Sequence, residues 1–316
     1  MLTLSGNTPL VRISYRLDGR EGAVWAKLES YNPSGSIKDR VAEYMLEQAI
    51  LRGELAPGQP IVEVTSGNTG IAFAAVGART GHPVHLFMPD WASEERKKLM
   101  RLYGATLHEV SREDGGFLAS FRMAEALAGE LGAYQPRQFD NRDNVLAHRL
   151  TTGAELVREL PGITDFCSGV GTGGTLTGTA QALRAAGPVR ITAVEPDACA
   201  LLSGGTSLRP HRIEGISDEL IPSILDRRLI DRVQVLSDLD AVWMAARLSR
   251  ELGLGVGISS GANFLGAAES DGPGRVSATV FPDDSKKYLS TSLSDPLPPS
   301  ADSVAARIEL LGVDKR

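Results

Sequence analysis

The stretch "PIVEVTSGNTGIAFAAVGARTG" (residues 60–81) decides the fold. It begins with a short run of β-branched and apolar residues, typical of a buried strand, and ends with apolar residues at helical spacing. The same order recurs twice directly downstream, with "PVHLFMP" before "SEERKKLMRLYGA" (83–105) and "TLHEVS" before "GGFLASFRMAEALAGEL" (106–131). Alternation of strands and helices predicts a parallel sheet with helices on both faces.

A second series of strands and helices follows, from "ITDFCSGVG" (163–171) to "SATVFPD" (277–283). The two series meet near "QFDNRDN" (138–144), so we expect two α/β lobes with a cleft between them. The stretch 292–316 begins as a linker rich in Pro, Ser and Asp and ends in a short amphipathic pattern. That end could dock on the body or on a partner.

Composition excludes several classes of function. The chain has 316 residues, a net charge of −6 and no cluster of basic residues, which argues against a nucleic-acid partner. No apolar run is long enough to cross a membrane, and the start lacks the layout of a signal peptide. Two cysteines, Cys167 and Cys199, cannot form a disulfide framework, so we expect a cytoplasmic protein. The histidines show no metal-ligand spacing, and we expect no metal.

A lysine stands where a cation is unfavourable. In "NPSGSIKDRVAEYMLEQAI" (32–50), the apolar spacing predicts a helix from Ser36 onward, and Ser36 with Asp39 forms a capping box. Lys38 then lies in the first turn, at the positive end of the helix dipole. Partial desolvation there would lower the pKa of its ammonium group, and a neutral amine attacks aldehydes to form a Schiff base.

Three turns rich in Gly, Ser and Thr each lead from a strand into a helix. They are "EVTSGNTGIA" (63–72), "SGVGTGGTLTG" (168–178) and "GVGISSGANFLGAA" (255–268). Such a turn presents free backbone N–H groups and the positive end of the helix dipole, which suits a phosphate or a carboxylate. Three of them, with Lys38 at a fourth helix start, indicate a ligand with several anionic groups.

A dinucleotide site is the competing interpretation. Gly169, Gly171 and Gly174 fit G-x-G-x-x-G, and Glu195 ends the next strand. This interpretation leaves Lys38 and the turn 63–72 without a role. The turn also carries hydroxyl groups that suit a phosphate monoester, from Thr172, Thr175 and Thr177. A Walker-type loop is absent, because no G-K-[ST] follows the glycines. A lysine imine, a phosphate cup and a carboxylate-binding turn together describe a pyridoxal phosphate site that holds an amino acid.

Five motifs carry a family resemblance: "NPSGSIKDR", "TSGNTG", "QFDNRDN", "GTGGT" and "GISSGA". In their order and spacing the chain resembles, over residues 5–291, the cysteine synthase (O-acetylserine sulfhydrylase) and cystathionine β-synthase family of fold-type-II pyridoxal phosphate enzymes. The resemblance implies an α/β fold like that of the tryptophan synthase β chain, with two lobes, each a mostly parallel twisted sheet flanked by helices. It implies a smaller mobile lobe (42–146) with the substrate-carboxylate turn, a larger cofactor-binding lobe (1–41 and 147–291) and a C-terminal tail (292–316).

The resemblance also assigns roles to residues. Lys38 would form the internal aldimine and then shuttle the α-proton. Asn68 would hydrogen-bond the phenolic oxygen of the cofactor ring, and Ser259 would face the pyridine nitrogen. The phosphate would lie in a cup formed by Gly171, Thr172, Gly173, Gly174 and Thr175. The amino-acid substrate would be bound by Thr65, Ser66, Gly67, Thr69, Gln138 and Gly215.

The implied activity is a β-replacement in cysteine biosynthesis. An O-activated serine, O-acetylserine first, would lose its leaving group to give an aminoacrylate, and sulfide would add to it to give L-cysteine. A serine at the pyridine nitrogen makes the ring a weaker electron sink than aspartate would, which favours prompt loss of a β-leaving group. The family also implies a homodimer and serine acetyltransferase as a partner.

The loop "EGISDELIP" (214–222) departs from the "GIGAGFIP"-like loop of relatives that use O-acetylserine. Its acidic residues resemble the loop of cystathionine β-synthases and would repel O-phosphoserine, whereas Arg209 and Arg212 upstream could clamp a phosphate. The alternatives are therefore an O-phosphoserine sulfhydrylase, a condensation of serine with homocysteine and, from a different class, a nucleotide-binding dehydrogenase. The run "SEERKKLM" (93–100) is predicted to be a solvated helix face.

Overall fold

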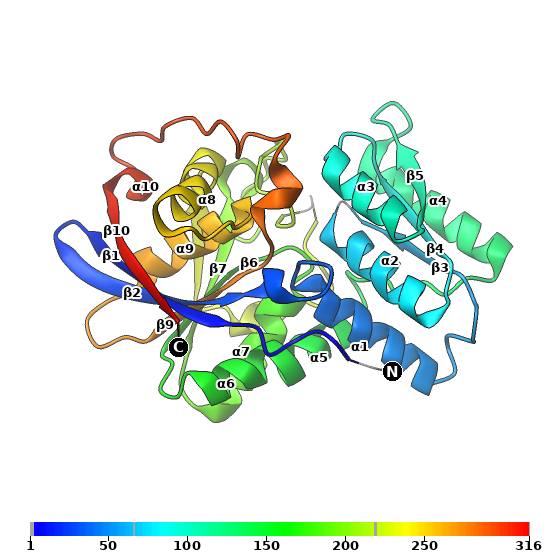
Figure 1. Ribbon diagram of the computed structural model, residues 1–316, viewed down its shortest axis with the longest axis horizontal. Helices are drawn as coiled ribbons and strands as arrows, with labels where there is room; N and C mark the ends of the chain where they lie inside the picture. The colour runs from blue at the N-terminus through cyan, green and yellow to red at the C-terminus, as the bar shows by residue number, and fades with distance from the viewer. Residues whose placement is uncertain (1–2, 66, 218–219, 316) are drawn as a thin grey trace.

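The computed structural model describes residues 3–65, 67–217 and 220–315. Two sheets of different size lie side by side, each flanked by helices (Figure 1). The predicted fold class, an α/β protein with two lobes built on mostly parallel sheets, is therefore confirmed.

The larger sheet has seven strands in the order β10-β1-β2-β9-β6-β7-β8. The five strands from β2 to β8 in this order run parallel to one another, whereas β1 is antiparallel to both of its neighbours. The strand bounds are β1 Leu10–Leu17, β2 Arg20–Leu28, β6 Asp165–Gly169, β7 Arg190–Pro196, β8 Arg232–Leu236, β9 Ser277–Phe281 and β10 Ile308–Lys315.

Helices cover both faces of the larger sheet because its strands alternate their side chains between two cores. Along β7, Val194 packs on the side of helices α8 (Asp238–Leu252) and α9 (Ile258–Ser270). The preceding residue of the strand, Ala193, packs on the opposite face, on the side of α7 (Gly174–Ala186). Below α7 in Figure 1 lie α5 (Asp143–His148) and α6 (Ala154–Glu159), which are joined by a π-helical turn (Arg149–Gly153).

The smaller sheet consists of three parallel strands in the order β3-β4-β5. Its central strand and β3 are almost wholly buried, as a parallel sheet covered on both faces requires. Helix α4 packs on one face, and α1 and α2 pack on the other. The bounds are β3 Ile61–Val64, β4 Val84–Pro89, β5 Thr106–Val110, α1 Lys38–Leu51, α2 Asn68–Thr80, α3 Glu94–Leu102 and α4 Gly116–Leu131.

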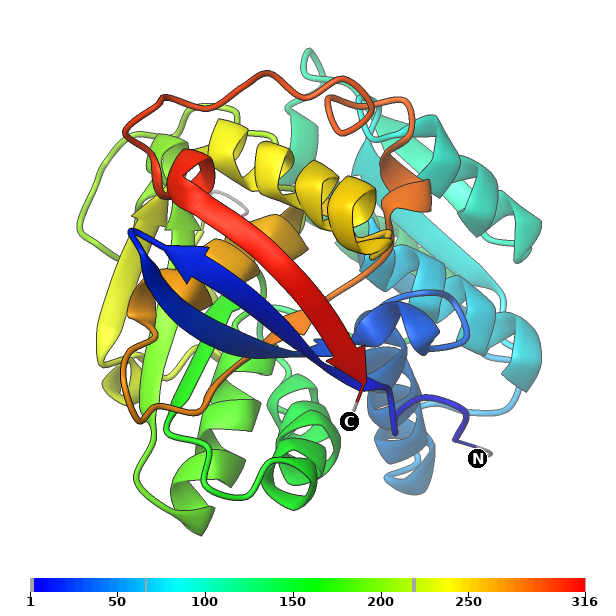
Figure 2. The ribbon, with the colours of Figure 1, turned by 60° about the vertical axis from the view of Figure 1, so that its left-hand side comes forward.

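The C-terminal stretch docks on the body of the same chain. After a short helix α10 (Val304–Arg307), strand β10 pairs with β1 from Val11–Lys315 to Leu17–Ile308. Figure 2 shows this strand lying along β1 at the edge of the larger sheet. The amphipathic pattern at this end of the sequence is therefore mostly a strand, whose apolar face packs on the core beside α8.

Helix α1 begins two residues later than the sequence pattern predicts. Ser36 still caps it, because its hydroxyl oxygen accepts the N–H of Lys38 at 3.2 Å. The Asp39 carboxylate accepts the N–H of Ser34 at 2.9 Å and also interacts with the N–H of Ser36, as the predicted capping box requires. The loop that precedes α1 is thus hydrogen-bonded to the first turn of the helix.

The first turn of α1 is also held by a buried ionic network. The Arg40 side chain is fully buried and donates to Glu29 at 2.6 Å and to Glu155 at 2.6 Å. Lys27 completes the group with a 2.8 Å ion pair to Glu155. Burial raises the pKa of Glu155, but the hydrogen bonds and charge of Arg40 outweigh burial and lower it to about 2. Each charge therefore has a partner inside the protein.

Replacing Arg40 by methionine should destabilise the protein strongly, because Glu29 would become a buried charge without its partner. Removal of one partner of a buried ion pair costs roughly 3–5 kcal/mol. Denaturant unfolding of Arg40→Met measures this loss. Arg228→Met is the matched control, since Arg228 is largely exposed where it pairs with Asp226 and should lose much less stability. Equal losses in the two variants would contradict the role given to Arg40.

Candidate active site

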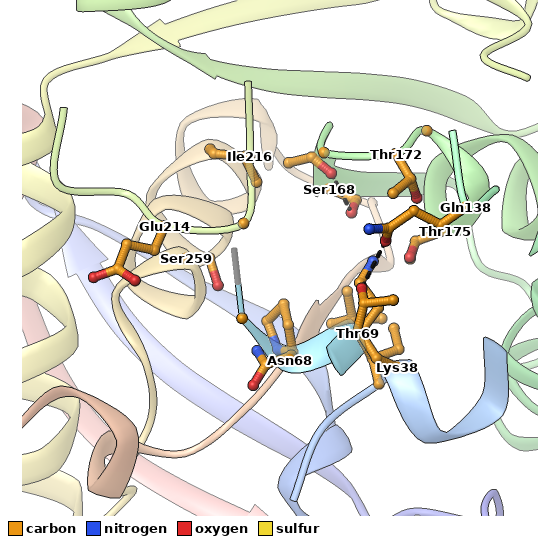
Figure 3. Close-up of a pocket in the computed structure, with 18 of the residues that line it drawn as sticks. Lys38, Asn68, Thr69, Gln138, Ser168, Thr172, Thr175, Glu214, Ile216 and Ser259 are labelled. Carbon is orange, nitrogen blue, oxygen red and sulfur yellow. Dashed lines mark hydrogen bonds between the residues drawn. The ribbon is translucent and has the colours of Figure 1, made fainter. Parts of the chain in front are cut away.

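One pocket lies between the two lobes and receives residues from both. Of the predicted site residues, Ser66 lies outside the described part of the chain, and Gly174 lies next to the pocket without lining it. All the others line this one pocket: Lys38, Thr65, Gly67, Asn68, Thr69, Gln138, Gly171, Thr172, Gly173, Thr175, Gly215 and Ser259. Figure 3 shows side chains from several distant elements pointing into this space.

Lys38 reaches the pocket from the start of α1. The backbone before it is fixed to the larger lobe, because the N–H of Ile37 donates to the carbonyl of Pro282 at 2.8 Å. Ser36 forms a β-bridge with Asp283, the residue that follows Pro282. The lysine side chain is half-buried. These bonds place a primary amine at the junction of the lobes.

The turn between β6 and α7 forms a cradle that requires glycine at two positions. A Cβ at Gly171 would lie 2.2 Å from the carbonyl oxygen of Gly215, and Gly173 has a positive φ of +81°. The first N–H groups of α7 point out of the helix end, where they can bind an anion. Asn263 of α9 fixes the end of the strand by accepting the N–H of Gly169 at 2.7 Å.

Two residues outside the predicted set orient the hydroxyl groups of this cradle. Asn144 donates its amide to Thr172 Oγ1 at 3.0 Å, which leaves the Thr172 hydroxyl proton for a ligand. Nε2 of His148 lies 3.1 Å from Thr175 Oγ1. Burial lowers the pKa of His148 well below its usual value, helped by the charges of Lys38 and Arg40, so the ring is neutral. The sequence could have indicated these two residues by their spacing. Asn144 is the last residue of the motif "QFDNRDN" (138–144), and His148 follows it by about one helical turn.

The turn before α2 faces the cradle across the pocket. Thr69 donates its hydroxyl to Gln138 Oε1 at 2.6 Å, and Gln138 Nε2 donates to the carbonyl of Val64 at 2.9 Å (Figure 3). The N–H of Gly67 donates to Thr65 Oγ1 at 3.1 Å. This turn offers hydroxyl groups and a helix start to an anion, as a carboxylate site requires.

Asn68 and Ser259 lie between the lysine and the mouth of the pocket. Asn68 donates its amide to Asp283 Oδ2 at 2.7 Å, and its Oδ1 is buried with no partner among the described residues. Ser259, 4% exposed, stands in the first turn of α9. An orphaned carboxamide oxygen, a cradle that excludes Cβ atoms and a nearby amine together fit a ligand with a ring hydroxyl, a phosphate and an aldehyde, which is pyridoxal phosphate.

The prediction of a solvated face for residues 93–100 is wrong for Arg96, Lys97 and Met100, which are buried. Arg96 is 2% exposed and Lys97 is 5% exposed, because α3 turns this face toward the protein. Arg96 lines the pocket and forms an ion pair with Glu214. Glu214 belongs to the loop at the mouth of the pocket (residues 209–217), which we call the mouth loop. No feature of the sequence distinguished Arg96 from the other charged residues of the run.

The arginines suggested as a phosphate clamp do not line the pocket. Arg212 pairs with Asp238 at 3.1 Å, and Arg209 donates to Ser207. The dinucleotide interpretation is also wrong, because Glu195 is fully buried and accepts the N–H groups of Leu202 and Ser203 at 2.7 and 2.8 Å. That carboxylate shapes a local turn and cannot reach a ribose.

Within the ranges 3–65, 67–217 and 220–315, no group of three or more His, Cys, Asp or Glu side chains is arranged to bind a metal ion. Among the helices of the same ranges, none is both long enough and apolar enough to cross a bilayer.

Known proteins resemble the chain over most of its length. The family described as "Pyridoxal-phosphate dependent enzyme" matches residues 1–283. A cysteine synthase of Staphylococcus aureus is 40% identical over 91% of this chain and 94% of its own. The O-ureido-L-serine synthase of Streptomyces lavendulae is 41% identical over 93% of this chain and 92% of its own. The crystal structure of a hydrogen sulfide-producing enzyme from Fusobacterium nucleatum superposes with a TM-score of 0.95, at 45% identity and with coverage of 99% and 97%.

Protonation of Glu63 should make stability depend on pH. Its carboxylate lies beneath Gln138 and accepts that residue's N–H at 3.2 Å, and burial raises its pKa to about 7 from an ordinary 4.5. The fold therefore favours the protonated form. Stability should fall as the pH rises from about 4.5 to about 7, by at most about 3 kcal/mol.

Thermal unfolding of Glu63→Gln between pH 5 and pH 8 measures this contribution. The difference in melting temperature from the unchanged protein should grow in favour of the variant as the pH rises, because glutamine does not ionise. Glu54→Gln, at an exposed ion pair with Arg52, is the control and should show no such trend. A constant difference for Glu63→Gln would contradict the raised pKa.

Proposed function

The chain belongs to the pyridoxal-phosphate dependent enzymes and, within them, to the cysteine synthase family, and on this basis we propose that it converts O-acetyl-L-serine and sulfide into L-cysteine. The observation that carries the proposal is the convergence of three features in one pocket. These are an amine at a helix start, a glycine and threonine cradle, and a turn that can bind a carboxylate. Each belongs to a different stretch of sequence, so their meeting requires the fold.

Pyridoxal phosphate, when bound, supplies an aldehyde and a conjugated ring that accepts electrons from the α-carbon of an amino acid. In the proposal, the cradle from Gly171 to Thr175 holds its phosphate, Lys38 holds its aldehyde carbon, and Ser259 faces its ring nitrogen. Asn68 holds the ring hydroxyl, and its position is fixed by Asp283.

The residues around the substrate bind and orient it. The Thr65 hydroxyl, whose oxygen accepts the N–H of Gly67 and whose proton is left for a ligand, and the backbone N–H of Thr69 hold its carboxylate at the start of α2, where the helix dipole favours negative charge. Gln138 is locked by Thr69 and Val64 and presents its second amide hydrogen to the same carboxylate. With the carboxylate fixed, the α-proton faces the Lys38 amine, which removes it and later returns it.

The charges of the pocket favour an uncharged acetyl ester over a phosphate ester on the oxygen of the serine substrate. Among the described residues that line the pocket, the only cations are Lys38 and Arg96, and Arg96 is paired with Glu214. No arginine there is left for a phosphate ester, and this supports O-acetylserine over O-phosphoserine. A relative of similar identity is named an O-ureido-L-serine synthase, and the nucleophile is therefore tested directly below. The homodimer and the serine acetyltransferase partner stay predictions.

The proposal predicts a colour sequence for the purified protein. The protein should be yellow, its visible band should shift to longer wavelength with O-acetylserine, and sulfide should restore the original band with release of cysteine. O-phosphoserine, and serine with homocysteine, are tested in parallel. Lys38→Ala should lose cysteine formation by more than about 1,000-fold, since proton transfer at the α-carbon lacks its base. Turnover at the original rate in this variant, or a larger kcat/KM for O-phosphoserine in the unchanged protein, would contradict the proposal.

Replacing Gln138 by alanine should weaken binding of the amino acid without loss of cofactor. The substrate carboxylate loses one hydrogen-bond donor, so KM for O-acetylserine should rise about tenfold or more. Visible absorbance per protein reports the cofactor content and should be unchanged. A colourless variant would show that Gln138 supports the cofactor site instead.

A further inference from the structure

Arg96 stands where three separate segments meet. It extends from α3, and its guanidinium lies 4.7 Å from the centre of the Tyr288 ring. It forms an ion pair with Glu214, whose side chain is 30% exposed at the mouth. The end of its side chain also lies close to Gly67, where an added Cβ would come within 3.1 Å of Arg96 Nε and Cζ. One side chain therefore contacts the mouth loop, the substrate turn and the segment after β9.

Other bonds already attach α3 to the larger lobe. Ser93 donates to the carbonyl of Lys287 at 3.1 Å, and Ser290 donates to Glu95 from its N–H at 2.9 Å and its hydroxyl at 2.7 Å. These bonds do not involve the mouth loop. The specific contribution of Arg96 is thus the link from α3 to Glu214.

The mouth loop is already fixed on both sides of Glu214, because Ile213 and Ile216 are buried in the core of the larger lobe and the N–H of Arg212 donates to Asp238 at 2.8 Å. Two further contacts hold it against the pocket. On the side of the phosphate cradle, the N–H of Ser217 donates to the carbonyl of Val170 at 2.8 Å. On the opposite side, the loop is held through Glu214 and Arg96. Figure 3 shows Glu214 across the pocket from Lys38, with its carboxylate pointing away from the other labelled side chains. The ion pair therefore spans the lip of the pocket without occupying the reaction space.

Burial makes this pair stronger than an ordinary surface pair. Arg96 is 2% exposed, and its Nε is buried with no hydrogen-bond partner among the described residues. A guanidinium so removed from water depends on its carboxylate partner and on the Tyr288 ring face. Release of Glu214 would leave the cation poorly compensated, and this disfavours an open loop.

We propose that Arg96 and Glu214 form a latch that holds the mouth loop over the pocket and couples it to the substrate turn at Gly67. Arg96 is a positioning residue in this scheme. The closed mouth retains the bound amino acid and limits entry of water, and the end of the Arg96 side chain sets the position of the turn that binds the carboxylate. The kinetic consequences rest on the proposed function, whereas the effect on the loop does not.

Hydrogen exchange of the complete, cofactor-loaded enzyme without substrate tests the latch directly. Glu214→Gln keeps the size of the side chain and removes its charge. Peptides covering residues 209–217 should exchange about tenfold faster in this variant, because local opening costs less. Arg96→Met should have the same effect, and the double variant should add little to either single change. Arg101→Met is the matched control: it removes an exposed cation of the same helix, paired with Glu109, and should leave exchange unchanged.

Steady-state kinetics provide the second readout. In Glu214→Gln, KM for the amino-acid substrate should rise about tenfold while kcat stays within about twofold, as expected for a lost closing contact. Unchanged loop exchange in Glu214→Gln, or fully multiplicative effects in the double variant, would overturn the latch. So would a gain of O-phosphoserine turnover with unchanged exchange, which would make Arg96 an anion site. Failure of the proposed function would appear differently, as absent turnover with the exchange effect intact.

Discussion

Arg40 shares its five N–H donors among Glu29, Glu155 and Thr8, and the rest of the site depends on this buried network. It joins β2, α1 and α6 beneath the turn that carries Lys38. A lysine on a long flexible side chain can act at one atom only if its backbone is fixed. The network provides that rigidity inside the protein, where a charge without a partner would cost several kcal/mol.

The pocket exploits the ends of helices more than the faces of sheets. Helices α1, α2, α7 and α9 all begin at its wall, so their unpaired N–H groups and positive dipole ends converge on one space. An anionic cofactor and an anionic substrate are therefore attracted from several directions. Behind this wall, Asn144 and His148 hold the threonine hydroxyls of the cradle in place. Rigid support of this kind lets small residues do the binding.

The mouth of the pocket differs in character from its base. The base is made of glycines, hydroxyls and amides whose positions are fixed by the core, whereas the lip is closed by a charged pair from two lobes. A pair of this kind can be broken and re-formed at a cost set by its burial. Relatives of similar identity carry different activities by name, including a cysteine synthase and an O-ureido-L-serine synthase.

The sequence by itself determined the alternation of strands and helices from residue 60 onward, the mostly parallel sheets, the glycine turn before α7 and the lysine at the start of α1, but not the strands β1, β2 and β10. These features are local, since periodicity, turn residues and caps act over a few neighbouring positions. It also indicated the family, because five motifs lie in register. Only the tertiary structure decided that Arg96 is buried, that Glu195 closes a local turn, and that the last strand pairs with β1. A charged run has the same pattern whether it faces water or a partner far along the chain, and burial depends on which residues the fold brings together.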